Sequence, residues 1–171
     1  MISDILNVVC WLDENLYRSD LMRTQILFIT QGVSFMGNSI QKNFEAAGYD
    51  VVRTNPVVEE ISVRKDDISI FVFYLGKFVE DIPEVLVYLK DVCLEEEKFL
   101  ILLGNLDELS VVENSIPDSA VTAKFERPID LKKLTAEIQM LVQAVDVREA
   151  KKSLNVCEYC DVKYKWYELI P

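Results

Sequence analysis

Short apolar runs alternate with amphipathic stretches through the middle of the chain. Residues 26–29, 68–75 and 99–103 are almost wholly apolar, which is typical of strands buried on both faces of a parallel sheet. Residues 49–52 and 120–125 predict two shorter strands. The pattern therefore predicts five strands in about 120 residues.

Between these runs, apolar residues recur every three or four positions, as on one face of a helix. Asp130 is a favourable N-cap for the last of these segments, and Gly48 a favourable C-cap for the first. The predicted helices cover residues 36–47, 57–63, 85–93, 106–112 and 131–145. Regular alternation of strand and helix predicts an α/β fold, a flavodoxin-like doubly wound parallel sheet of five strands in the order 2-1-3-4-5.

Two segments lie outside this unit. Residues 1–22 predict a helical extension, which either docks on its own domain or mediates self-association. Its apolar residues are Ile2, Ile5, Leu6, Val9, Trp11, Leu12 and Leu16. Residues 148–171 begin with a basic hinge at 148–152, and alternating apolar residues from Leu154 to Trp166 predict one or two half-buried strands. We therefore divide the chain into residues 1–22, a domain at 23–147, and a C-terminal extension or start of a further module at 148–171.

Charge and composition narrow the possible partners. The net charge of −11 disfavours binding to nucleic acid or to an anionic membrane. No segment reaches the roughly 18 apolar residues of a membrane span, and the N-terminus lacks the features of a signal peptide. The four cysteines do not form the pattern of a secreted disulfide framework. We expect a cytoplasmic protein.

The chain contains no histidine. A Ser-His or Cys-His dyad and a His-ligated metal are therefore excluded. No other pair of nucleophile and base is evident, so the sequence predicts a protein that is not an enzyme and that needs no metal or cofactor.

Three segments, at residues 26–29, 46–52 and 127–131, together resemble receiver domains of two-component response regulators. Their order and spacing carry the resemblance, which covers about residues 24–145. The dipeptide Arg127-Pro128 stands where the family has Lys-Pro at the end of the fifth strand. The resemblance implies the fold predicted above and a cis peptide bond before Pro128.

The resemblance also implies a phosphorylation site, and this sequence departs from it at every position. The family phosphorylates an aspartate at the end of the third strand and binds Mg²⁺ with two acidic residues after the first. The two metal-binding positions fall here at Thr30 and Gln31, and the acceptor position near Val72 or Phe73. The hydroxyl position falls at about Gly104, and the lysine position at Arg127, which we expect to cap the sheet edge or pair with a surface carboxylate. The resemblance therefore points to a degenerate receiver, or pseudo-receiver.

A second motif leaves an alternative open. Residues 32–39 follow a strand and read G-x-x-x-x-G-N-S, close to a phosphate-binding loop but with Asn in place of the essential Lys. A nucleotide or flavin would use the loop from Thr30 to Ser39, with the binding residues Gly32, Ser34, Gly37, Asn38 and Ser39. The glycines are equally explained by tight turns.

Cys157 and Cys160 form a C-x-x-C pair. One such pair lacks the second pair of ligands that a structural zinc site requires. The leading hypothesis is thus a phosphorylation-independent signalling module of response-regulator type. We expect protein partners, including a second copy of the chain in a homodimer. The family's usual partner surface falls at residues 106–112, 120–125 and 130–144.

Overall fold

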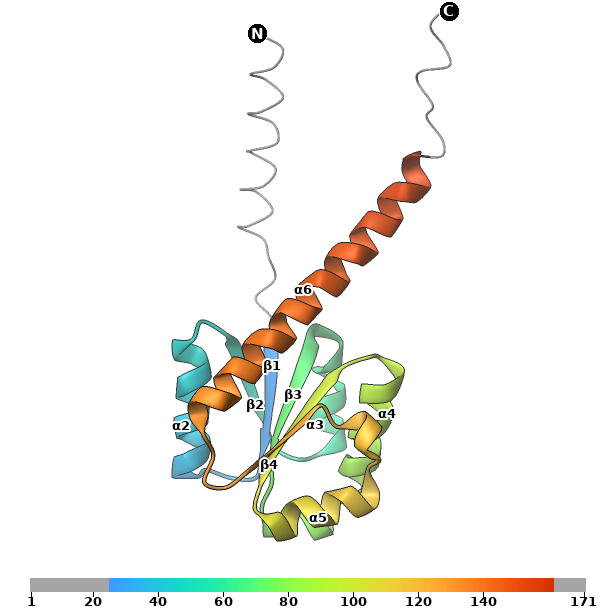
Figure 1. Ribbon diagram of the computed structural model, residues 1–171. Coiled ribbons are helices and arrows are strands. Elements are labelled where there is room, and N and C mark those ends of the chain that lie inside the picture. The colour runs from blue at the N-terminus through green and yellow to red at the C-terminus, as the bar shows by residue number, and fades with distance from the viewer. Residues whose placement is uncertain (1–24, 162–171) are drawn as a thin grey trace, which may run out of the picture.

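The computed structural model describes residues 25–161, with side chains up to residue 152. Five parallel strands form one sheet in the order β2-β1-β3-β4-β5, which confirms the predicted fold (Figure 1). The strands are β1 (Gln25–Thr30), β2 (Asp50–Thr54), β3 (Ile68–Tyr74), β4 (Phe99–Gly104) and β5 (Ala123–Glu126). The helices are α2 (Phe35–Ala46), α3 (Val58–Ser62), α4 (Pro83–Glu95), α5 (Leu106–Ser115) and α6 (Leu131–Asp161).

Helices cover both faces of the sheet and divide the core into two clusters. Helices α2 and α6 pack on one face, where Phe28, Phe44 and Ile138 are fully buried. Helices α3, α4 and α5 pack on the other, around Phe71, Phe73 and further residues. Successive residues of β1 and β3 contribute to opposite clusters, since side chains alternate along a strand. The central strands are therefore apolar throughout.

The ends of several elements follow the local signals in the sequence. Asp130 accepts hydrogen bonds from the backbone N–H groups of Lys132 and Lys133, at 3.0 and 3.2 Å, and so caps α6 as predicted. Gly48 follows α2 with a φ of 92°, which favours glycine. The peptide bond between Arg127 and Pro128 is cis, as the family resemblance implied.

The prediction for the C-terminal segment was wrong as far as the structure describes it. Helix α6 has 31 residues and runs without a break through the expected hinge at 148–152 to Asp161. Residues 154–161 are therefore helical rather than extended, and α6 crosses the predicted boundary at residue 147 without a break. Residues 148–152 include Ala, Arg, Glu and Lys, which are strong helix formers, and the segment has no Gly or Pro to end the helix. The remaining part of the expected strands, residues 162–171, and the N-terminal extension lie outside the described residues.

None of the helices within residues 25–161 has both the length and the apolar character that a membrane span needs.

Two phenylalanines of α2 provide a test of the packing. Phe44 is fully buried against the sheet, whereas Phe35 is 89% exposed. We expect Phe44→Ala to lower the free energy of unfolding by about 3–5 kcal/mol, because the substitution leaves a cavity. Phe35→Ala, the matched control, is expected to change it by no more than about 0.5 kcal/mol. Urea denaturation followed by circular dichroism measures both, and equal effects would contradict this packing.

Candidate functional site

The carboxyl ends of the strands bring the positions of a receiver site to one edge of the sheet. Thr30 pairs with Tyr74 across β1 and β3, and Gly104 pairs with Glu126 across β4 and β5. Parallel α/β sheets commonly bind ligands at this edge. The candidate site is therefore the group of side chains that meets there.

Arg127 directly follows β5, the outermost strand, and its side chain reaches along this edge to the end of β3. Its backbone N–H donates to the carbonyl of Gly104 at 2.9 Å, which extends the pairing of β4 with β5. Its guanidinium carbon lies 4.8 Å from the centroid of the Tyr74 ring, within the range of a cation–π contact. Nη2 donates to the carbonyl of Leu75 at 2.6 Å and to Oε2 of Glu108 at 2.5 Å. Arg127 thus connects the ends of β3, β4 and β5.

Glu108 supplies the carboxylate of this group from the first turn of α5. Its side chain is only 7% exposed. Oε2 also accepts from the backbone N–H of Asn105 at 3.0 Å, while the Asn105 side chain accepts from the N–H of Glu108 at 2.9 Å. This reciprocal arrangement is a capping box. One carboxylate therefore both starts α5 and neutralises Arg127.

Gly104 lies close to both Glu108 and Leu75, where there is little room for a side chain. A Cβ atom at residue 104 would lie 3.0 Å from Oε2 of Glu108 and 3.1 Å from Cδ1 of Leu75. Both distances are shorter than ordinary van der Waals contact. A serine or threonine at residue 104 would therefore require a small shift of the Glu108 carboxylate and of the Leu75 side chain.

The predicted acceptor positions, Val72 and Phe73, do not lie at the end of the third strand. Both are fully buried within β3, and they belong to opposite core clusters. The strand continues to Tyr74, which is the residue level with Thr30. Tyr74, rather than Val72 or Phe73, is therefore the residue of β3 that lies at the carboxyl edge beside Thr30.

The two predicted metal-binding positions lie at the end of β1. Thr30 ends β1 and is buried, and Gln31 follows it and is exposed. Arg127 pairs with a carboxylate, as expected, but that carboxylate is buried rather than on the surface. Among residues 25–152, whose side chains the structure describes, no cluster of three or more acidic or cysteine side chains is arranged to hold a metal ion.

In the loop that resembles a phosphate-binding loop, the polar side chains already have hydrogen-bond partners within the protein. Ser34 caps α2 by accepting from the N–H of Gly37 at 2.9 Å. Asn38 accepts from Nη1 of Arg53 at 2.7 Å, and Nη2 of Arg53 donates to the carbonyl of Gly32. Ser39 lies within α2. The turn also requires its glycines, because Gly32 has a φ of 64° and a Cβ at Gly37 would lie 2.9 Å from Ser34 Oγ.

Sequence reasoning missed three of these residues. The spacing Asn105-x-x-Glu108 is a readable capping-box signal, but nothing local connects it to Arg127. Tyr74 could not be assigned without the true end of β3. Arg53 reaches Asn38 only because β2 lies beside β1, with Arg53 level with Phe28.

No family model matches the sequence, and no curated protein matches it. Solved structures do match. The signal receiver domain of an HD domain-containing protein from Pseudomonas fluorescens Pf-5 has a TM-score of 0.60 at 12% identity, covering 75% of this chain and 93% of that chain. A protein described as an adenylate cyclase from Rhodopirellula baltica has a TM-score of 0.58 at 16% identity, covering 77% and 96%.

A CheY-like protein from Pseudomonas aeruginosa PAO1 has a TM-score of 0.54 at 14% identity, covering 69% of this chain and 98% of that chain. Identities this low establish the fold and leave the chemistry open. The domain built on β1 to β5 has the CheY-like fold of response-regulator receiver domains.

Proposed function

We propose that this domain is a phosphorylation-independent signalling module, which acts by binding other proteins and catalyses no reaction. The observation that carries the proposal is the contact of Arg127 with both Glu108 and Tyr74. Phosphoryl transfer to a receiver needs an acceptor carboxylate, carboxylate ligands for Mg²⁺, and a free cation for the phosphoryl group. Tyr74, Thr30 and Gln31 supply neither kind of carboxylate, and the cation already has an anionic partner.

Glu108 supports a more specific form of this proposal. Its carboxylate accepts hydrogen bonds from the loop after β4 and from the residue after β5. A phosphoryl group bound at this edge would make the same kinds of contact, with a backbone N–H and a basic side chain. We infer that Glu108 replaces the phosphoryl anion and holds α5 and β5 in one fixed arrangement.

The proposed partner surface consists of α5, β5 and the first half of α6, which are the elements that Glu108 and Arg127 connect. On the solvent side of this surface, Lys124 on β5 forms ion pairs with Glu113 on α5 at 2.9 Å and with Asp118 at 2.7 Å. The first of these pairs also connects β5 to α5. Leu106, at the start of α5, is 64% exposed. A cytoplasmic location is part of the proposal and is supported by the free, buried thiol of Cys93.

The alternative, a nucleotide or flavin site in the loop from Thr30 to Ser39, is less well supported. Two of the side chains that would contact such a ligand, those of Ser34 and Asn38, already bind Gly37 and Arg53. A ligand would have to break both interactions.

The first prediction concerns phosphorylation. Incubation with acetyl phosphate and Mg²⁺ is expected to give no phosphorylated species in an intact-mass measurement, because the strand ends offer no acceptor carboxylate. A receiver domain that autophosphorylates with acetyl phosphate serves as the positive control in the same buffer. A hydroxylamine-sensitive phosphorylated species would contradict the proposal, since that sensitivity indicates an acyl phosphate.

The second prediction concerns the strength of the Glu108–Arg127 pair. We expect a double-mutant cycle of Glu108→Gln and Arg127→Met to give a coupling free energy of about 1–3 kcal/mol, because either single variant leaves a partly buried charge unpaired. Denaturant unfolding of the four proteins measures it. A cycle of Glu113→Gln and Lys124→Met on the same two elements is the exposed control, with an expected coupling below about 1 kcal/mol. Additive effects at Glu108 and Arg127 would show that the pair does not hold the site together.

A further inference from the structure

Helix α6 continues well beyond the domain that it covers. Arg148 marks the level at which the helix passes the amino edge of the sheet, because its guanidinium carbon lies 5.6 Å from the centroid of the Phe99 ring at the start of β4. Its Nη1 also donates to the carbonyl of Glu97. The helix runs on to Asp161, which at 1.5 Å per residue adds about 20 Å. Figure 1 shows this half of α6 projecting away from the sheet.

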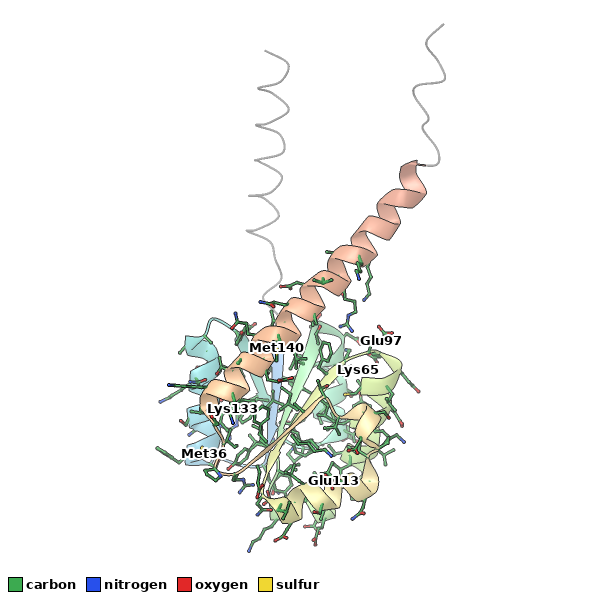
Figure 2. The ribbon with its side chains drawn as sticks, in the orientation of Figure 1. Met36, Lys65, Glu97, Glu113, Lys133 and Met140 are labelled. Carbon is green, nitrogen blue, oxygen red and sulfur yellow. The ribbon has the colours of Figure 1, made fainter. Side chains whose placement is uncertain are left out.

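An exposed apolar line runs along α6 on the side opposite the core. Ile138 and Val145 are buried, whereas Met140 and Val147 are 57% and 54% exposed. Each exposed residue follows a buried one by two positions, which at 3.6 residues per turn places it about 200° further round the helix. Met140 can be followed on α6 in Figure 2. The helix therefore has one apolar side for its own domain and a second that is exposed among the described residues.

The spacing along this line is that of a two-stranded coiled coil. Met140 and Val147 are seven residues apart, and Leu154 continues the interval in the sequence. They occupy position a of successive heptads, in which position d falls at Gln143 and Ala150. Both of these residues are exposed as well. From residue 140 to its end at residue 161, α6 provides about three heptads.

The charges beside this line favour a second copy of the same helix in parallel orientation. Asp146 lies at position g and Lys151 at position e of the next heptad, and both are exposed. In a parallel pair, position g of one helix lies next to position e of the following heptad on the other helix. Asp146 would then face Lys151 of the second copy, and the same contact would repeat by symmetry. An antiparallel pair brings g beside g and e beside e, and so does not join these two charges.

We propose that α6 mediates parallel homodimerisation of this protein, as a two-stranded coiled coil that begins at Met140 and Val147. The two domains lie on the outer sides of the pair, because the side of each helix that contacts its own core faces away from the contact. Neither Arg127 nor Glu108 takes part, so the inference is independent of the proposed function.

The oligomeric state of the full chain is the first test, measured by sedimentation equilibrium over a series of concentrations. The unmodified protein is expected to be a dimer that dissociates on dilution. Val147→Asp is expected to raise the dissociation constant about tenfold or more, since it places two carboxylates at one level of the contact. Val87→Asp on α4 is the matched control, because Val87 is 45% exposed on a helix that packs on the other face of the sheet. The control is expected to leave the dissociation constant unchanged.

An exchange of the two charges tests the parallel orientation. Asp146→Lys and Lys151→Asp are each expected to raise the dissociation constant about fivefold, because each replaces two attractive contacts in the dimer with two repulsive ones. The variant that carries both substitutions is expected to recover the value of the unmodified protein. Within one helix these residues lie about 140° apart and do not meet, so recovery requires contact between two copies.

Three results would overturn the proposal. The first is a chain that stays monomeric throughout the concentration series. The second is a dimer that Val147→Asp weakens no more than Val87→Asp does, since its contact would lie on another surface. The third is a double exchange that fails to recover the affinity lost in the single variants, because the two helices would then not be parallel and in register.

Discussion

The contact of Arg127 with Glu108 organises the carboxyl edge of the sheet around the ends of β3 and β4. One guanidinium donates to the Leu75 carbonyl and to the Glu108 carboxylate while it covers the Tyr74 ring. A Cβ at residue 104 would crowd both Glu108 and Leu75, so glycine is the residue that fits beside them without a shift. A buried carboxylate so close to the strand ends is tolerated because it is paired and hydrogen-bonded. The paired side chains of Arg127 and Glu108 therefore occupy this part of the carboxyl edge.

The fold itself does not depend on these residues. Two apolar clusters, one on each face of the sheet, hold the five strands and their helices together. This separation explains how a chain only 12–14% identical to a signal receiver domain and a CheY-like protein has the same topology. Residues at the strand ends can change their chemistry while the strand interiors keep their apolar pattern, since burial and backbone pairing supply most of the stability.

The pattern of apolar residues was sufficient to predict the strands that are buried on both faces of the sheet. The apolar runs at residues 26–29, 68–75 and 99–103 are β1, β3 and β4 to within a residue or two at each end. The prediction failed in the C-terminal segment, where the same residues fit both a strand pattern and a helix pattern. Residues 154–160 alternate as in a strand, yet α6 continues through them because nothing in residues 148–161 ends a helix.

The candidate site was predictable only in part, because it depends on strand register. The sequence led to Val72 or Phe73 as the predicted acceptor position, whereas the residue of β3 level with Thr30 is Tyr74. That difference follows from where β3 ends, which neighbouring strands decide. Glu108 is recognisable as a helix-capping residue from Asn105 alone. Its pairing with Arg127 requires β4 and β5 to be adjacent, with Gly104 level with Glu126.

The central claim is that Arg127 already has its anionic partner, and a phosphoryl mimic tests it most directly. The measurement is the amide ¹H–¹⁵N correlation spectrum of the protein, recorded with Mg²⁺ before and after addition of beryllofluoride. We predict no change at the amides of Thr30, Tyr74, Gly104 and Arg127. Saturable shifts confined to those amides would contradict the account, because they would mean that the edge of the sheet still binds a phosphoryl group.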